Sequence, residues 1–375
     1  MREFEVNKYR RKNPAPELAE KQPFRHAVVI PVYNELSSFA AAEHSIREAL
    51  KRISESVAVI AVINYPAGAD SAESEKLLNL IKVGVFPGVI PLYLPELSGG
   101  VGAARKAGMD AFIRTVSPED MEKSVIFSLD ADTLIEKDYF VKVLPEALKG
   151  GAVSIGFSHQ KAPDAEHQAA IDRYERYLHR YVEKLRSCGS PYGFFTVGSA
   201  FAVRCDAYLK AGGMKVREAG EDFYFLQAVA KSSGVRSIDE VLVHPSPRIS
   251  ARVPFGTGRA VAGLLRGEEL NEIPDRAFEV LKEVLKNAVD EKLETGEKFL
   301  SFLPLAAVEF FLKERFPEAW KKVAANLPER AGARGTAFNE WFDGLKTLRF
   351  LHFLQNLFPM LMLILGISFE ITSDF

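Results

Sequence analysis

The fold is indicated by the stretch VIFSLDAD, residues 125–132, in which an apolar run ends on two carboxylates. Val125 to Phe127 have the composition of a buried strand, so Asp130 and Asp132 follow its carboxyl end. Open α/β sheets bind ligands at that edge, and Mg²⁺ and Mn²⁺ prefer one or two carboxylates together with substrate phosphates. We therefore expect a divalent cation and a phosphorylated ligand here. The alternative is an ordinary turn after a strand, where Asp is common.

The residues before this stretch alternate between strand and helix patterns. Apolar runs of strand length are separated by segments whose apolar residues recur at helical spacing. Strand alternating with helix predicts a parallel sheet with helices on both faces. The strands are expected at residues 26–32, 57–63, 89–94 and 124–129, and the helices at residues 37–53, 71–83 and 103–115.

The pattern changes after residue 132, where helices become longer and strands shorter. From about Ala260 onward the spacing is helical, with breaks at prolines and glycines. We expect an N-terminal arm over residues 1–25, an α/β domain over residues 26–259 and a helical C-terminal extension over residues 260–375. Strands are expected at residues 152–157, 194–204 and 237–244, and helices at residues 137–149, 165–187, 206–211 and 221–232.

The composition is that of a soluble globular protein, with 47% hydrophobic and 26% charged residues among 375. A net charge of −2 argues against a nucleic-acid binder, which would carry a basic face. Cys188 and Cys205 are the two cysteines, and no Cys/His spacing suggests zinc. We therefore expect a reducing, cytoplasmic compartment.

Both ends of the chain bear on a membrane role. Residues 1–22 are charged throughout and lack the apolar core of a signal peptide, so we expect a flexible or peripheral arm. The apolar segment from Leu357 to Phe369 has thirteen residues, fewer than the ~20 that span a bilayer. A helix in a core or a dimer interface is favoured, and a helix in the membrane interface is the alternative. Peripheral contact with the inner face of the membrane and a homo-oligomer both stay open.

Four motifs between Ala27 and His244 resemble the family 2 glycosyltransferases with a GT-A fold. Each motif is weak alone, but all four stand in the family's order and at plausible spacing. Gly198 to Phe201 and the pair Gly212-Gly213 precede the last of them. The motifs are IPVYNE at residues 30–35, GAARKAG at residues 102–108, LDAD at residues 129–132 and GED at residues 220–222.

The resemblance implies a mixed, mainly parallel sheet flanked by helices, and a hexosyltransferase-like enzyme. Such an enzyme moves a sugar from a nucleotide-diphosphate sugar to the hydroxyl of a saccharide, a lipid-linked sugar or a small molecule, typically with inversion. It implies Mn²⁺ or Mg²⁺ at Asp130 and Asp132, and Asp222 as the general base with Glu221 orienting it or contacting the acceptor. Without the other motifs, Glu221 and Asp222 would be acidic residues at a helix start. The implied nucleotide-sugar contacts are Pro31, Tyr33, Asn34, Glu35, Asn64, Gly102, Arg105 and Asp130.

Two positions depart from the family pattern. Relatives often carry an acidic residue after the second strand, whereas this chain has Asn64, which can both donate and accept hydrogen bonds at a base edge. Lys106 stands where the family usually has Asn. It could add charge toward a diphosphate or point to solvent.

Two further features follow the acidic pair. His244 ends a strand; a His at this point is a metal ligand in some GT-A enzymes, and a loop residue without a role is as good an interpretation. Residues 246–259 hold Arg248, Arg252 and Arg259 and are interpreted as a lid over the diphosphate, or as a connector.

Other activities fit less well. The glycine loop over residues 99–102 could bring backbone N–H groups to a phosphate, but it follows the third strand, which argues against a dinucleotide-binding dehydrogenase. A nucleotidyltransferase would need a glycine-rich, basic loop after the first strand, and residues 31–36 lack it. A non-catalytic nucleotide-sugar or partner-binding module is the remaining alternative, against which the intact Asp130, Asp132 and Asp222 argue.

Overall fold

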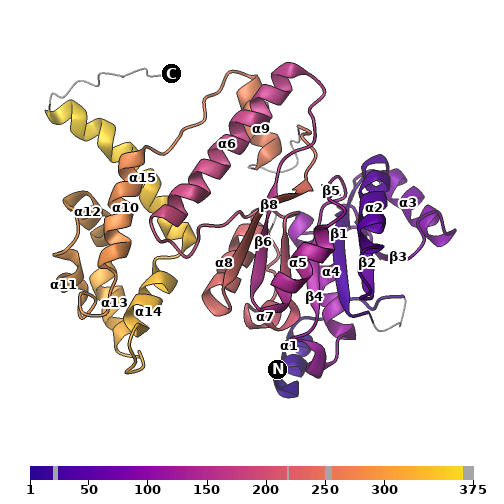
Figure 1. The fold of residues 1–375 in the computed structure, drawn as a ribbon, viewed down its shortest axis with the longest axis horizontal. Helices are drawn as coiled ribbons and strands as arrows, with labels where there is room; N and C mark the ends of the chain where they lie inside the picture. Colours follow the sequence, from indigo (N-terminus) through magenta and orange to yellow (C-terminus); the bar gives the residue numbers. More distant parts are fainter. Residues whose placement is uncertain (20–23, 218, 250–255, 366–375) are drawn as a thin grey trace. The chain divides into compact units, whose positions relative to one another are not determined.

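The computed structural model describes residues 1–19, 24–217, 219–249 and 256–365, and its central feature is an eight-stranded sheet (Figure 1). The strands are β1 His26–Val32, β2 Val57–Asn64, β3 Val89–Leu94, β4 Val125–Ser128, β5 Leu134–Ile135, β6 Ala152–Phe157, β7 Phe201–Arg204 and β8 Val235–His244. They lie in the order β3-β2-β1-β4-β7-β6-β8-β5. Strands β7 and β5 run antiparallel to their neighbours, and the other pairs are parallel. The predicted mixed, mainly parallel sheet is confirmed.

The helices agree with the periodicity of the sequence. Of the predicted strand over residues 194–204 only the end forms β7, and the two-residue β5 was not predicted. The helices are α1 Glu3–Lys12, α2 Leu36–Leu50, α3 Ala72–Lys82, α4 Gly100–Thr115, α5 Tyr139–Leu148, α6 Ala165–Ser187, α7 Cys205–Lys210, α8 Glu221–Ser232, α9 Thr257–Leu265, α10 Asp275–Asn287, α11 Gly296–Leu300, α12 Leu305–Lys313, α13 Phe316–Ala324, α14 Ala333–Trp341 and α15 Gly344–Leu365.

Strand β1 is buried along its whole length because it lies between β2 and β4. Its pairing with β2 runs the full strand, whereas only Ala27, Val28 and Val29 pair with β4. The amide of Leu129 donates to the Val29 carbonyl, so by alternation the position of the missing Pro31 N–H also faces the β4 side. No β4 residue pairs there, which is why the strand tolerates a proline.

Helix α4 lies unusually close to the sheet at Gly108. A Cβ atom at that residue would stand 2.6 Å from methyl carbons of both Val29 and Val62. Only a residue without a side chain permits this approach. The second glycine of the GAARKAG motif therefore fixes the height of α4 above β1 and β2, and with it the position of the helix start.

The N-terminal arm is not a flexible segment over residues 3–12, because α1 docks on α4. Tyr9 is buried and donates from its hydroxyl to Asp110 Oδ1 at 2.7 Å, and Tyr208 donates to the same oxygen at 2.8 Å. Lys106 pairs with Asp110 Oδ2 and donates to Asn13 Oδ1. Lys106 thus holds the arm, which is neither of the two roles that the sequence left open.

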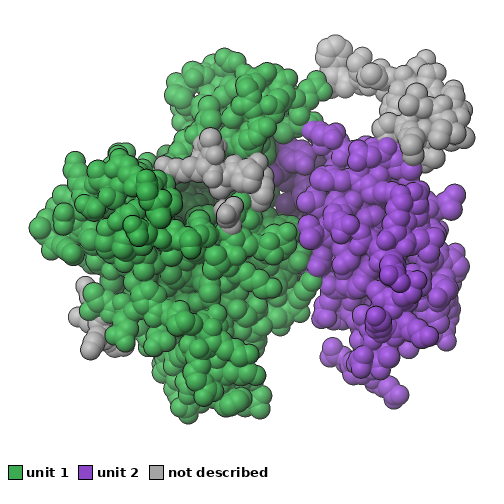
Figure 2. Space-filling view, turned by 180° about the vertical axis from the view of Figure 1, so that it is seen from behind, with its two compact units in different colours: residues 1–176, 194–270 green, residues 177–193, 271–375 purple. Residues whose placement is uncertain are grey.

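The chain forms two compact units, residues 1–176 with 194–270 and residues 177–193 with 271–375 (Figure 2). Helix α6 begins in the first unit and ends in the second. Helix α9 belongs to the first unit, so the second unit starts later than the predicted extension at residue 260 and also takes in part of α6. Its core is rich in aromatic rings: Phe299, Phe310, Phe311, Phe316, Trp320, Phe338, Phe342 and Phe350.

The apolar C-terminal segment begins inside this second core. Phe358 packs in the aromatic cluster, as a core helix requires, while residues 366–369 of the predicted segment lie outside the described residues. Among the helices that the structure describes, none is long and apolar enough to cross a membrane.

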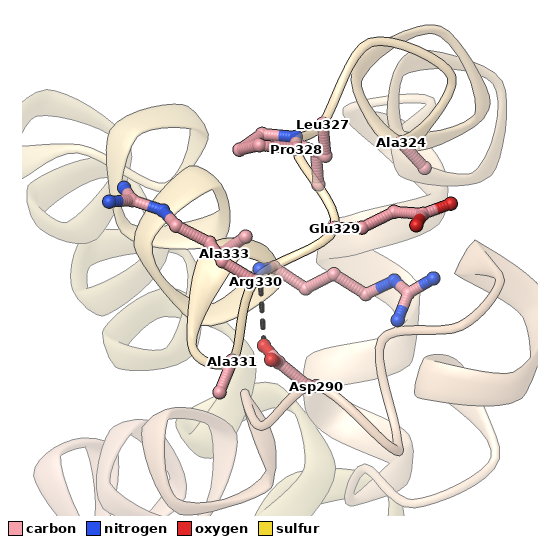
Figure 3. A pocket seen from close by; sticks show the side chains of 9 residues that line it. Asp290, Ala324, Leu327, Pro328, Glu329, Arg330, Ala331 and Ala333 are labelled. Carbon is pink, nitrogen blue, oxygen red and sulfur yellow. Dashed lines mark hydrogen bonds between the residues drawn. The ribbon is translucent and has the colours of Figure 1, made fainter.

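A cavity of about 340 Å³ opens in the second unit between Asp290 and the segment that leads into α14 (Figure 3). The Asp290 carboxylate accepts hydrogen bonds from the amides of Gly332, Arg334 and Gly335 at 2.5 to 3.1 Å. These bonds lower the pKa of Asp290. The carboxylate of Asp290 thus already binds the N-terminal amides of α14. None of the predicted site residues lines the cavity.

Candidate active site

The two carboxylates of the LDAD motif lie at the carboxyl edge of the sheet, as the sequence predicts. Asp130 and Asp132 follow β4, with 36% and 12% of their side chains exposed. Strand β6 runs in the direction of β4 because both are antiparallel to β7. The loop after β6 therefore reaches the same edge, where Gln160 Nε2 donates to the Asp132 and His244 carbonyls at 2.8 Å. No local sequence pattern marks Gln160, so the sequence did not identify it.

Arg105 connects the LDAD motif to the acidic pair. Its side chain is 2% exposed and comes from the second turn of α4. Nη2 donates to Asp130 at 2.9 Å, and Nε pairs with Glu221 at 3.3 Å. Nη1 donates to Ser128 Oγ at 2.8 Å and to the Gly198 carbonyl at 2.9 Å. The structure therefore brings Arg105 to the site, where its guanidinium contacts protein atoms; its role as a nucleotide-sugar contact stays a prediction.

The charge balance around Arg105 is set by three carboxylates. Burial alone would lower the pKa of Arg105, but Asp130, Glu221 and Asp222 together raise it. A buried guanidinium is tolerated only when its donors and its charge are both matched. The positions of the three carboxylates are accordingly tied to one another through a single cation.

Asp222 of the acidic pair has a strongly perturbed acidity. Burial, together with the negative charge of Glu221, raises the pKa of Asp222 to about 7, against the lowering effect of Arg105. Gly198 lies beside both Asp222 and Arg105, since a Cβ atom at Gly198 would be 2.7 Å from Arg105 Nη2 and 3.5 Å from Asp222 Oδ2. Glu221 is 4% exposed and ion-paired, so it is not a solvated residue at a helix start. Perturbed acidity of this kind is typical of functional sites.

Two glycines let α4 and α8 approach each other at this point. Gly220 precedes α8 in the left-handed region, with φ of 69°, which a glycine adopts without strain. A Cβ on Gly102 would stand 2.6 Å from the Arg217 carbonyl oxygen and 3.1 Å from Glu221 Cβ. Gly102 was predicted to contact the nucleotide sugar; in the structure it gives the start of α4 room beside the acidic pair.

Asp132 and Glu35 share a second arginine. Arg248 Nε lies 2.8 Å from Asp132 Oδ2, and its Nη2 pairs with Glu35 Oε1. Burial and the charge of Asp130 raise the pKa of Asp132 to about 7, against the opposing effect of Arg248. Of the predicted lid, residues 250–255 lie outside the described residues.

Arg259, the third arginine of the predicted lid over residues 246–259, pairs outside the acidic motif. Arg259 lies in α9 and pairs with Glu268 at 3.5 Å. Among the described residues of the predicted lid, Arg248 is therefore the arginine that reaches the acidic motif.

Five of the predicted nucleotide contacts, Pro31, Tyr33, Asn34, Glu35 and Asn64, lie at or just beyond the ends of β1 and β2. Pro31 is buried in β1, and Tyr33 is half-buried just after it. Asn34 Nδ2 donates to the Asp70 carbonyl at 3.2 Å, so this side chain joins two loops. Asn64 is 7% exposed, and its Oδ1 is buried without a hydrogen-bond donor among the described residues. A buried amide oxygen without a donor costs free energy, so the burial of Asn64 is not compensated by the hydrogen bonds of the described residues.

The imidazole of His244 has partners other than Asp130 and Asp132. Its Nδ1 lies 3.0 Å from the Ser158 carbonyl and its Nε2 lies 3.0 Å from Glu136 Oε1. Within the described part of the chain, no three His, Cys, Asp or Glu side chains converge to hold a metal ion. The two carboxylates of the LDAD motif nevertheless fit Mg²⁺ or Mn²⁺, which take one or two protein carboxylates and draw the remaining oxygens from phosphates and water.

Comparison with known protein families gives one match. Residues 27–211 match the model of glycosyl transferase family 2. This match confirms the resemblance that the four motifs indicated and, with it, the GT-A type of fold. No curated protein matches the sequence.

Two of the solved structures to which the chain is similar are glycosyltransferases by their descriptions. Residues 1–349 of S. aureus TarS in complex with UDP-GlcNAc give a TM-score of 0.42 at 12% identity, over 84% of this chain and 90% of that one. The mannosyltransferase PcManGT from Pyrobaculum calidifontis, in complex with GDP-Man and Mn²⁺, gives 0.41 at 16% identity, over 96% of this chain and 86% of that one.

Proposed function

We propose that this glycosyltransferase, whose family 2 domain matches over residues 27–211, moves a hexose-like sugar from a nucleotide-diphosphate donor to an acceptor hydroxyl. The reaction would use Mn²⁺ or Mg²⁺ and invert the anomeric carbon. The observation that carries the proposal is the arrangement around Arg105. This buried cation holds Asp130 of the phosphate-side motif and Glu221 of the acidic pair, with Asp222 beside them at a pKa of about 7.

Asp130 and Asp132 would hold the cation, which when bound neutralises the charge that develops on the departing diphosphate. The two carboxylates lie at the carboxyl edge, which is where an α/β sheet presents ligands. Asp132 is mostly buried, and a buried carboxylate is stabilised by a nearby positive charge.

Asp222 would accept the proton of the acceptor hydroxyl. A general base works best when its pKa lies near the operating pH, and burial has brought Asp222 to about 7. Glu221, the neighbour of the base in the chain, would orient it and is itself held by Arg105. A direct displacement needs one base and no covalent intermediate, and it would invert the anomeric carbon.

Asn64 would read the nucleotide base. Strand β1 separates β2 from β4, and strands spaced about 4.8 Å apart place the end of β2 about 10 Å from the LDAD motif. A nucleoside can occupy that interval, with Pro31, Tyr33 and Glu35 lining the strand end between. The acceptor would be a saccharide, a lipid-linked sugar or a small molecule.

Activity is tested by incubating the protein with UDP-, GDP- and dTDP-sugars with and without Mn²⁺, with sugar acceptors, and measuring released nucleotide and glycosylated product. Metal-dependent product formation supports the proposal. Binding of a nucleotide sugar without any turnover favours a non-catalytic module on the same fold. Release of pyrophosphate from a sugar phosphate and a nucleoside triphosphate favours a nucleotidyltransferase.

Asp132→Asn should lower metal-dependent nucleotide release by about 100-fold or more, because even groups that merely support a metal ligand are worth about 10–100-fold. The fold should persist, since the carboxylate faces a ligand site. Mn²⁺ titrations of the release rate, with circular dichroism for folding, provide the measurement. Asp138→Asn, an exposed Asp paired with Arg52, is the matched control. Wild-type turnover by Asp132→Asn at ordinary Mn²⁺ would remove Asp132 from the metal site.

The rate of transfer should fall as the pH is lowered through about 7. The pKa of Asp222 is raised to that value, so below it the carboxyl is protonated and cannot accept the acceptor's proton. The profile is measured as kcat at saturating Mn²⁺ and donor. Glu221→Gln removes the charge that helps to raise the pKa, so its acid limb should move to lower pH. An unmoved limb in that variant would assign the ionisation to another group.

Asn64→Leu should weaken nucleotide binding by about 2–10-fold, the loss expected from one neutral hydrogen bond. Calorimetry with UDP and GDP measures the change. Asn79→Leu, on the exposed side of α3, is the control for adding an apolar side chain. Unchanged affinity for every nucleotide tested would place the base elsewhere.

A further inference from the structure

Arg248 occupies the position between Asp132 and Glu35 that a cation bound to Asp132 would have to share. The carboxylates of both partners are largely buried, at 12% and 8% exposed, whereas Arg248 is 40% exposed. The guanidinium contacts Asp132 through Nε at 2.8 Å and Glu35 through Nη2. In this state the carboxylate of Asp132 already has a positive partner.

The backbone leading into Arg248 makes two hydrogen-bond contacts, although it lies outside any helix or strand. His167 Nε2 of α6 lies 2.7 Å from the Pro247 carbonyl oxygen, one residue before Arg248. The Arg248 amide is 3.3 Å from Ser246 Oγ. A change of partner would therefore be a rotation of one long side chain about an anchored backbone.

The other arginine of the site lacks this freedom. Arg105 is 2% exposed and donates to four protein groups, so it cannot leave the carboxylates without burying unpaired charge. A divalent ion and a guanidinium on the same carboxylate repel each other, and a diphosphate is the group for which an arginine fork is well suited. The metal ion and the Arg248 guanidinium can thus occupy the site together only when a diphosphate is present to bind Arg248.

We propose that Arg248 is a positioning residue that couples metal binding to donor binding. Without a nucleotide it pairs with Asp132 and Glu35 and competes with the metal ion. With a nucleotide diphosphate present it transfers to the phosphates and leaves Asp132 to the metal. This inference rests on the proposed function and adds to it an order: the ion and the donor bind cooperatively, and each strengthens the other by the same factor.

The test measures Mn²⁺ binding to the full chain with and without UDP or GDP, by electron paramagnetic resonance of free Mn²⁺ and by calorimetry. Protein-free samples correct for Mn²⁺ that the nucleotide itself holds. The wild type should bind Mn²⁺ about 5–150-fold more tightly with nucleotide than without. Arg248→Gln should bind Mn²⁺ alone more tightly than the wild type and should show a smaller coupling factor, because only the direct contact between the ion and the phosphates then remains.

Two variants sharpen the comparison. Arg248→Lys keeps the charge but not the fork that spans two carboxylates, so its coupling factor should be intermediate. Arg259→Gln changes an arginine of α9 that pairs with Glu268, and it should leave both Mn²⁺ affinities unchanged.

The possible outcomes distinguish a failure of this inference from a failure of the proposed function. If Arg248→Gln binds Mn²⁺ alone no better than the wild type, or keeps the full coupling factor, the inference is overturned while metal-dependent transfer can stand. If the wild type binds Mn²⁺ with none of the nucleotides, the metal assignment of the proposed function fails and takes the inference with it.

Discussion

Asp222→Asn is expected to lower the rate of sugar transfer by about 10²–10⁴-fold, the usual contribution of a general base. Donor affinity should stay near that of the wild type, because Asp222 acts on the acceptor. An amide has nearly the shape of the carboxylate, and Arg105 keeps its partners Asp130 and Glu221. The fold should therefore persist.

The measurement separates rate from affinity, with calorimetry for the donor and single-turnover kinetics for transfer. Glu221→Gln is the matched neighbour and should lose less rate, or mainly weaken acceptor binding. A loss of donor affinity in Asp222→Asn, with the rate retained at saturation, would place Asp222 in the metal or nucleotide site. The base would then have to be another residue.

Arg105→Met is expected to destabilise the protein by about 3–5 kcal/mol, which is the cost of removing one partner from a buried ion pair. The methionine fills similar space but leaves Glu221, at 5% exposure, and Asp130 without their cation. Urea unfolding followed by circular dichroism gives the free energy of unfolding. Arg52→Met is the matched control, since Arg52 is 50% exposed and pairs with Asp138 on the surface; it should cost about 0–1 kcal/mol.

A second variant distinguishes charge from packing. Arg105→Met combined with Glu221→Gln removes one of the unpaired charges and should regain part of the lost stability. If the double variant is no more stable than Arg105→Met, the cost comes from lost packing. If Arg105→Met costs no more than Arg52→Met, the buried cation does not hold the site together.

The sequence predicts the parts of this protein that depend on local pattern. The strands over residues 26–32, 89–94 and 152–157 and the helices over residues 165–187 and 221–232 have the bounds that periodicity indicated. The LDAD motif lies at the expected edge because a buried strand leads straight into it. These inferences need only neighbours within a turn or a strand.

The remaining features depend on partners that are distant in the chain. Arg105 meets Glu221 and Gly198, Tyr9 meets Asp110, and Arg248 meets Glu35. No periodicity connects such pairs, so the sequence could propose Arg105 as a nucleotide-sugar contact but could not show with which carboxylates it pairs. The same reason explains residues 194–200, where the chain leaves the strand direction and Gly198 supplies a carbonyl to Arg105.

The position of α6 in the chain affects how the protein folds during its synthesis. Leu185 and Cys188 near its end pack in a core whose other members come from residues 273–358. Synthesis adds about 5–20 residues per second, so these side chains leave the ribosome on the order of 10 s before their last partners do. During that interval the first unit can complete its sheet while the end of α6 stays uncovered. A nascent chain paused between α8 and α10 should therefore be a strong client for a chaperone that binds exposed apolar segments, and the released full-length protein should not.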